Sequence, residues 1–362
     1  MFVVFIVCLL NTCCVFGGSV SDIIGKDTLD AVDKVSEREA GISISGFAEG
    51  ILSGEEVFSI ENITESAVNL FLKEIKESTE LIKPVFIAVI LSAILKTLSS
   101  SFNTKSVSEL SFYVCYMVMI FIVLKMFAIT GEVAKDALES MGNMVMASMP
   151  VFYTLMALSG DYTAAYITGP FVAGAAGVMT VVGKSVVIPV VSLGLTLEIV
   201  NNISEREKIG KLASLVKKGI KYGLKTIAAG FMAVLSIQKL GTSVVDMAAG
   251  KTAKALLGAV PVVGDVFSGA VETAVALTGA VKSSYLMAVI VVIGVICIIP
   301  VLKILAVMVI FKIIAAITEP IGEKRFIKML SEAGDYTGLV LSTLFTATVM
   351  FVFSAIIMMG II

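Results

Sequence analysis

Long apolar runs separated by short polar stretches dominate the chain after its first 83 residues. The longest run extends from Tyr285 to Ile317 and is interrupted only by Lys303 and Lys312. A helix over this run would be roughly 50 Å long, whereas the hydrocarbon core of a bilayer is about 30 Å thick. The run must therefore extend out of the bilayer or break into two spans at Pro300.

Seven further apolar runs accompany it. They lie at 84–98, 112–129, 141–158, 162–182, 185–200, 227–240 and 339–362. Runs of this length and apolarity predict transmembrane helices. We expect an all-α, polytopic membrane protein with about seven or eight transmembrane helices plus amphipathic helices. The exact number stays open, because 227–240 is short for a span and 285–318 could cross once or twice.

The N-terminal part predicts export. Residues 1–18 form a short apolar stretch that ends in small residues, as a secretory signal peptide does. Cleavage after it and retention as an anchor are both compatible with the pattern. Residues 19–83 follow as a small, acidic, helical segment, with 14 Asp or Glu against 6 Lys or Arg between Val20 and Lys83. In either case this segment is expected outside the cytoplasm.

A basic stretch at 201–226 separates two groups of transmembrane helices, 84–200 and 227–362, the second with a Gly-rich amphipathic segment at 241–283. Between Ser204 and Thr226 it carries 7 Lys or Arg and 2 Glu. Lysine excess places such a loop in the cytoplasm. The lysines predicted on the polar side of a helix lying on anionic lipid are Lys211, Lys217, Lys218 and Lys221. A plain cytoplasmic connector is the alternative.

Composition argues against several classes of activity. The chain is 57% hydrophobic and 15% charged, and it has no histidine, which removes the commonest general base and metal ligand. We expect no catalytic residue, no metal site, no cofactor and no nucleic-acid partner, and hence no enzyme. An aspartyl site of the Gly-x-Gly-Asp type would need glycine at position 262, where Val262 stands, and Gly334-Asp335 is a similar near miss.

Five charged residues within or beside the longest run are candidates for a polar path through the membrane. They are Asp265, Glu272, Lys303, Lys312 and Glu319. Asp265 and Glu272 are seven residues apart, as are Lys312 and Glu319, so each pair would share a helical face. An ionisable residue inside a membrane suggests function by default. The alternative is that the lysines reach the membrane surface with their long side chains.

The segment GAVPVVGDVFSGAVETA, followed by a lysine-bearing apolar run and ITEPIGEKRFIKML, resembles the stage III sporulation protein AE family of endospore-forming bacteria. The resemblance implies a multi-pass protein of the mother-cell membrane around the forespore. It also implies membership of a channel or transport complex that links the two cells. The implied partners are proteins of the same operon, including an ATPase and ring-forming subunits, and a forespore membrane protein. Homo-oligomerisation is a further expectation.

Two roles within such a complex are compatible with the sequence. The chain could form part of the conduit or a permease-like subunit, which the charges and the Gly- and Pro-broken spans favour. It could instead be a non-conducting scaffold that assembles the other subunits. A scaffold would tolerate neutral replacement of the charged residues in its membrane helices.

Overall fold

The computed structural model describes residues 24, 26–53, 76, 83, 87, 90, 91, 94, 105–158, 162–203, 209–257, 264–320 and 323–358. For 52–53, 105–112, 162–168, 234–257, 264–278, 280 and 358 only the backbone is described. Within these ranges all regular structure is helical. The elements are α3 (Lys26–Ala40), α4 (Ile44–Ser53), α6 (Lys105–Leu158), α7 (Tyr162–Val182), the π-helical turn η1 (Gly183–Val187), α8 (Ile188–Ile203), α9 (Gly210–Leu257), α10 (Gly264–Thr318) and α11 (Lys324–Met358).

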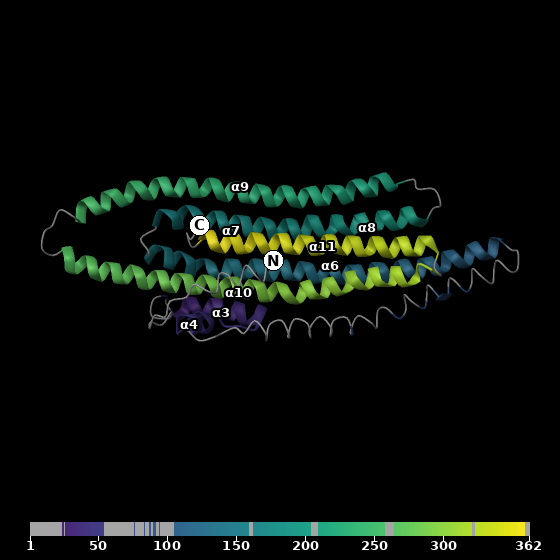
Figure 1. Ribbon diagram of the computed structural model, residues 1–362, viewed down its shortest axis with the longest axis horizontal. Coiled ribbons are helices and arrows are strands. Elements are labelled where there is room, and N and C mark those ends of the chain that lie inside the picture. Colours follow the sequence, from purple (N-terminus) through teal and green to yellow (C-terminus); the bar gives the residue numbers. More distant parts are fainter. Residues whose placement is uncertain are drawn as a thin grey trace.

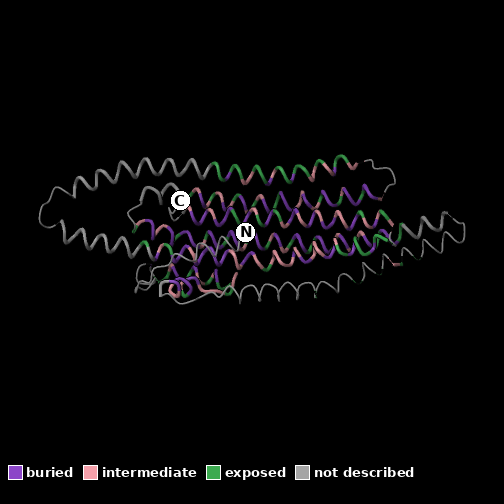
Figure 2. Tube along the Cα trace, in the orientation of Figure 1, coloured by how far each residue is buried: buried purple, intermediate pink, exposed green. Residues whose placement is uncertain are grey.

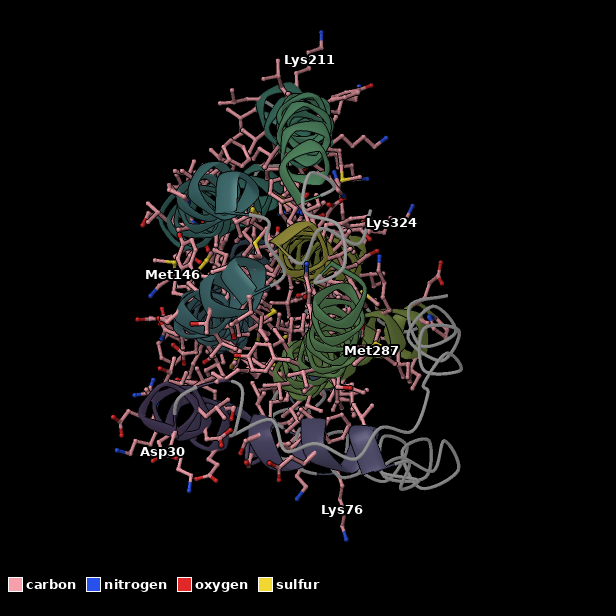
Figure 3. The ribbon with its side chains drawn as sticks, turned by 90° about the vertical axis from the view of Figure 1, so that its left-hand side faces the viewer. Asp30, Lys76, Met146, Lys211, Met287 and Lys324 are labelled. Atoms are coloured by element: carbon pink, nitrogen blue, oxygen red, sulfur yellow. The ribbon has the colours of Figure 1, made fainter. Side chains whose placement is uncertain are left out.

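The long helices lie side by side in one elongated bundle (Figure 1). Figure 3 shows the bundle end-on, with α9 on one flank, α3 and α4 on the opposite flank, and the other helices between them. Helix α11 packs against α10, α6, α8, α7 and α9, so it occupies the centre. The C-terminal ends of α8 and α10 lie at the same end of the bundle.

Four helical stretches in the described part of the chain are long and apolar enough to cross a membrane. They are Tyr113–Leu158, Gly169–Ile203, Val281–Thr318 and Lys324–Ile357, of 46, 35, 38 and 34 residues. The expected seven or eight spans are therefore not confirmed. The predicted run at 84–98 and the signal peptide at 1–18 lie largely or wholly outside the described residues.

The count differs because neighbouring apolar runs belong to single helices. Helix α6 contains both 112–129 and 141–158, and the charged residues between the two runs stay helical. The runs at 162–182 and 185–200 are joined by η1 into one continuous helical stretch. Helix α10 continues through Pro300, so 285–318 forms one helix. A polar interruption in the hydropathy pattern is thus no sign of a loop here, because each helix satisfies its own backbone hydrogen bonds.

Helix α9 also joins two predicted segments. It runs for 48 residues from Gly210 to Leu257, so the basic stretch and the apolar run at 227–240 share one helix without a boundary at 226. Its buried side carries Ala213, Ile220, Leu224 and Phe231, which recur at helical spacing. The basic half of α9 is therefore packed on the bundle, against α8 and α11.

Helices α3 and α4 form a small hairpin inside the predicted acidic segment. Gly41 ends α3 with a φ of +70°, a left-handed conformation that suits glycine. The Asp33 carboxylate accepts a hydrogen bond from the Ser45 backbone N–H at 3.0 Å and another from the Ser45 hydroxyl. This link fixes α4 against α3, and the hairpin packs on α6 and α10.

The core runs along the inner faces of the long helices, as the buried segments in Figure 2 show. Its largest fully buried side chains include Tyr116, Tyr285, Tyr336, Phe152 and Phe311. The Phe152 and Tyr285 rings meet edge to face, with centroids 5.5 Å apart. Each helix packs its inner apolar face closely against its neighbours, and this packing determines how the helices are arranged.

Candidate functional site

Four charged side chains from three helices meet in the half of the bundle where α8 and α10 end. Lys217 Nζ of α9 donates to Glu332 Oε2 and to Asp335 Oδ2 of α11, each at 2.8 Å. Lys312 of α10 donates to the other carboxylate oxygen of Asp335, and to Ser331 Oγ at 3.2 Å. We call Lys217, Lys312, Glu332 and Asp335 the four-charge cluster. Its formal charges sum to zero, and Asp335 bridges the two lysines.

Tyr336 forms the apolar wall beside the cluster. The ammonium of Lys217 lies 5.4 Å from the centre of the Tyr336 ring, within the range of a cation–π contact. The Tyr336 hydroxyl donates to the Ala213 carbonyl at 3.4 Å. A Cβ added to Gly194 of α8 would lie 2.5 Å from Tyr336 Cε1. Glycine at 194 therefore makes the room that the ring occupies.

The cluster is partly open to its surroundings. The side chains of Lys217 and Glu332 are 20% and 22% exposed, and those of Asp335 and Lys312 are 38% and 42% exposed. Gly334 lets the stem of Lys312 lie against α11, since an added Cβ would be 3.0 Å from Lys312 Cε. Partial exposure weakens each ion pair by screening and leaves the charges accessible to polar molecules.

Lys217 is held in its charged form. Burial lowers the pKa of its ammonium, but the hydrogen bonds and negative charges of Asp335 and Glu332 outweigh burial and raise the pKa above the ordinary 10.5. A raised lysine pKa contributes stability that is complete below the ordinary value and is lost only as pH rises through the higher folded value. The charge on Lys217 is therefore constant over the physiological range.

Comparison with known proteins assigns the sequence to a family. The family model described as "Stage III sporulation protein AE" matches residues 42–361. The chain belongs to this family. It is 24% identical to a Bacillus subtilis (strain 168) protein named stage III sporulation protein AE, over 304 residues that cover 84% of this chain and 76% of the relative. No solved structure matches. The chain is thus a membrane-helix protein of a sporulation family.

In this family member, Lys312 of the predicted polar path has a direct ionic partner. That partner is Asp335, on the next helix. Glu272 and Lys312 lie 40 residues apart on one unbroken helix, which is about 60 Å. They therefore make no ion pair with each other within one chain. The side chains of Asp265 and Glu272 lie outside the described residues, and their part in a polar path stays a prediction.

The two other candidates take different positions. Lys303 is half-buried on α10, nine residues before Lys312, and Glu319 is exposed in the turn that follows the helix. Because Glu319 stands after the end of α10, the helical face that it was expected to share with Lys312 does not extend to it. The Glu319 carboxylate therefore lies at the end of the bundle, outside the four-charge cluster.

The four lysines predicted for a membrane-surface helix divide into two groups. Lys211, Lys218 and Lys221 are exposed on α9, whereas Lys217 turns inward to α11. Lipid binding by the three outward lysines remains a prediction. The prediction placed Lys217 on the same polar side. Its partners in space, Glu332 and Asp335, lie far away in the sequence, so the pattern of 201–226 could not reveal them.

Sequence reasoning missed Glu332 and Asp335 as partners. Asp335 was considered only as part of a protease-like Gly-Asp pair. The available signal was the spacing of Glu332, Asp335 and Tyr336 at the start of the last apolar stretch, where residues three and four apart share one face. The lysines that pair with this face, Lys217 and Lys312, belong to other helices, so the spacing within α11 could not identify them.

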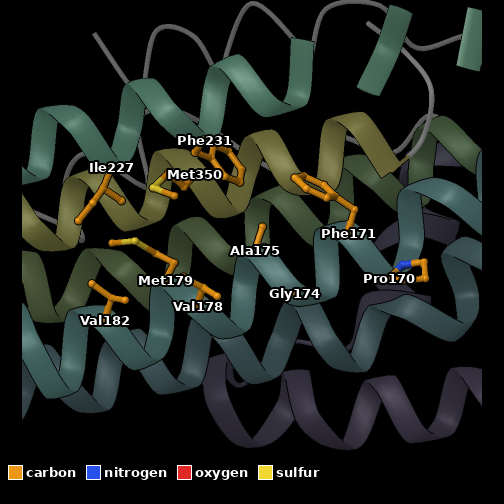
Figure 4. A pocket seen from close by; sticks show the side chains of 10 residues that line it. All are labelled: Pro170, Phe171, Gly174, Ala175, Val178, Met179, Val182, Ile227, Phe231 and Met350. Carbon is orange, nitrogen blue, oxygen red and sulfur yellow. The ribbon is translucent and has the colours of Figure 1, made fainter. Parts of the chain in front are cut away.

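An apolar pocket lies on the other side of the bundle, between α7, α9 and α11. It has a volume of about 410 Å³ and is lined by Pro170, Phe171, Gly174, Ala175, Val178, Met179, Val182, Ile227, Phe231 and Met350 (Figure 4). None of these side chains can donate or accept a proton. The pocket therefore offers hydrocarbon contact alone. Among the described residues, no group of three His, Cys, Asp or Glu side chains is arranged to hold a metal ion.

Proposed function

We propose that the chain is the membrane component of a sporulation channel or transport complex linking mother cell and forespore. In this proposal it contributes to the conduit or acts as a permease-like subunit. The four-charge cluster carries the proposal, because it places two cations and two carboxylates where α9, α10 and α11 meet. Family membership supplies the link to sporulation.

A purely structural bundle would need no charged network between these helices. Replacing a buried ion-pair network by well-packed apolar residues is often neutral or stabilising. A partly exposed, electrically neutral cluster therefore suits a hydrated path better than simple helix packing does.

The partners of this function belong to the proposal as well. They are other proteins of the same operon, including an ATPase and ring-forming subunits, and a forespore membrane protein. The chain itself carries no phosphate-binding Gly-x4-Gly-Lys-Ser/Thr loop, the element that a P-loop nucleotide hydrolase uses. Energy from nucleotide hydrolysis would then enter through a partner.

A non-conducting scaffold is the second candidate, and one observation favours it. Lys217 and Lys312 both bind Asp335, so the cluster ties α9, α10 and α11 together. Such a tie would serve a rigid platform equally well. The two candidates predict different outcomes when the charges are removed without loss of assembly.

The decisive experiment neutralises one pair and keeps the other. In the double variant Lys312→Met with Asp335→Asn, the Lys217–Glu332 pair remains and the cluster stays neutral. A conduit predicts a correctly assembled complex with spore yield reduced at least tenfold, and reduced solute flux in liposomes containing the operon partners. Wild-type yield and flux would instead support the scaffold. Glu319→Gln, at an exposed carboxylate outside the cluster, is the matched control.

A further inference from the structure

Five helices share a layer of the bundle in which no residue is charged. It comprises 140–158 of α6, 162–182 of α7, 226–238 of α9, 283–302 of α10 and 336–358 of α11. Thr348 Oγ1 lies 2.9 Å from Cys297 Sγ and 3.4 Å from Met141 Sδ, so α11, α10 and α6 are level there. We call this region the charge-free layer. Residues 140–158 rise by about 28 Å and residues 226–238 by about 18 Å. The charge-free depth that all five helices share is therefore at most about 18 Å, within the roughly 30 Å of a hydrocarbon core.

The other half of the bundle carries more charge, although it too exposes apolar side chains, among them Val114, Met117 and Phe121 of α6 at 59%, 53% and 70%. Helix α6 has 54 residues and is about 81 Å long, so well over half of it must lie outside the hydrocarbon core, which is about 30 Å thick. Beyond the charge-free layer it carries Lys125, the Glu132–Lys135 pair at 2.7 Å and Glu139, which is paired with Lys184. The four-charge cluster lies in the same half. Since each charge costs about 3 kcal/mol in a membrane, the charge-free layer is the half that lipid surrounds at lowest cost.

One flank of this layer is nevertheless covered by charged helices. The α3–α4 hairpin packs on α6 and α10 (Figures 1 and 3). Glu39 of α3 lies close to Ser140 at one edge of the layer, and both α3 and α4 pack on α10. The outward face of α3 therefore lies beside the layer. Its residues Asp30, Lys34, Glu37 and Arg38 are exposed.

The flank formed by α7 has an apolar surface instead. On α7, Val178 and Val181 are 62% and 61% exposed. The pocket between α7, α9 and α11 opens on this flank and is lined by apolar groups alone (Figure 4). A surface of this kind is stable against acyl chains, whereas the exposed face of α3 is stable only against water or polar groups.

We propose that the charge-free layer is the membrane-embedded part of the bundle and that its two flanks face different media. Lipid covers the α7 flank, while the α3–α4 flank borders water at the same depth. The chain therefore does not stand in the bilayer with lipid on all sides. This inference deepens the proposed function and rests on it in one respect, since a conduit requires a hydrated flank within the membrane.

Spin-label accessibility in proteoliposomes tests the proposal. Single cysteines at Asp30→Cys, Val178→Cys and Met117→Cys, in a chain whose five native cysteines are replaced by alanine, would each carry a nitroxide. All three positions are exposed. Oxygen collides most often with labels in lipid, and a water-soluble nickel chelate with labels in water. We expect a nickel-to-oxygen collision ratio at least tenfold higher at 30 and 117 than at 178.

Each other outcome overturns the proposal in its own way. High ratios at both 30 and 178 would place the charge-free layer outside the membrane. Low ratios at both would place α3 in lipid. A high ratio at 178 with a low one at 117 would put the membrane across the other half of α6. Because the readout is accessibility in proteoliposomes, it is independent of spore yield, so this proposal can fail while the proposed function stands.

Discussion

Replacing Asp335 by asparagine tests whether the four-charge cluster holds α9, α10 and α11 together. The substitution keeps the size of the side chain and removes the charge that bridges Lys217 and Lys312. Lys217 keeps Glu332 at 2.8 Å, whereas Lys312 keeps only the Ser331 hydroxyl at 3.2 Å. The cluster then has a formal charge of +1, with one lysine that has lost its anion.

The magnitude is set by the two hydrogen bonds that Asp335 accepts. A hydrogen bond to a charged group contributes about 1.5–3 kcal/mol, and the partial exposure of Lys312 and Asp335 reduces that contribution. We therefore expect Asp335→Asn to lower the free energy of unfolding by about 2–4 kcal/mol. At roughly 2 °C per kcal/mol for a larger chain, the melting temperature in detergent should fall by about 4–8 °C.

A compensating variant separates the charge effect from a general loss of packing. Lys312→Met combined with Asp335→Asn removes the isolated cation and leaves the Lys217–Glu332 pair intact. The double variant should therefore melt at a higher temperature than Asp335→Asn alone, although it carries one more substitution. The difference between the single and double variants measures their coupling.

The assay can use two thiols that the fold already protects. Cys115 and Cys297 are buried and free, so a thiol-reactive dye should report unfolding once the three leader cysteines, outside the described residues, are replaced by serine. Glu319→Gln is the carboxylate control and should leave the melting temperature within about 1 °C, as surface substitutions usually do. A double variant that melts at or below the temperature of Asp335→Asn would refute the charge argument.

Two further predictions concern local packing and pH. Gly194→Ala should lower the free energy of unfolding by about 1–3 kcal/mol, because the added Cβ would lie 2.5 Å from Tyr336. The control Gly174→Ala should not lower it, because its Cβ would meet nothing within 4 Å. Equal melting temperatures of the two variants would contradict the close packing of Gly194 against Tyr336. For Glu39, burial raises the pKa, but hydrogen bonds from Ser140 and Arg38 and the charge of Arg38 outweigh it and hold the pKa below its ordinary 4.5. The ionised Glu39 carboxylate stabilises α3 fully above pH 4.5, and this stabilisation is lost as pH falls through the lower pKa of the folded state. Amide hydrogen exchange in α3 should therefore accelerate over that acidic range in the wild type. The acceleration should be smaller in Glu39→Gln.

The inferred flanks change how the N-terminal segment is understood. The acidic segment at 19–83 was expected outside the cytoplasm. In the structure, α3 and α4 of this segment pack on α6 and α10. If the α3 flank borders water within the bilayer, this hairpin supplies polar surface to the place where a conduit would need it.

The sequence by itself determined the class of the molecule. Apolar runs from residue 84 onward predicted membrane helices, and all described regular structure is helical. The segments at 258–274 and 317–330 identified the family, which the match over 42–361 confirms. The family rests on the resemblance of these segments. The membrane class follows from composition and local pattern, because an apolar residue favours lipid or a core whatever its neighbours in space are.

Helix lengths were decided by the tertiary structure. The charges between 129 and 141 appeared to end one span and begin another, yet α6 passes through them. Such residues can stay helical because the backbone hydrogen bonds are local, while the side chains reach water or partners such as Lys184, which binds Glu139. Local hydropathy does not contain the position of those partners.

The pairing of charges was decided in the same way. Lys312 stood out in the sequence because it interrupts an apolar run, but its carboxylate partner could not be chosen among Asp265, Glu272, Glu319 and Asp335. The choice depends on how α10 and α11 lie against each other, which the packing of their inner faces determines. Lys217 likewise looked like its outward neighbour Lys218, and the rotation of α9 about its axis turned only Lys217 toward Asp335. A charge can be identified one residue at a time, whereas an ion pair requires the arrangement of the whole bundle.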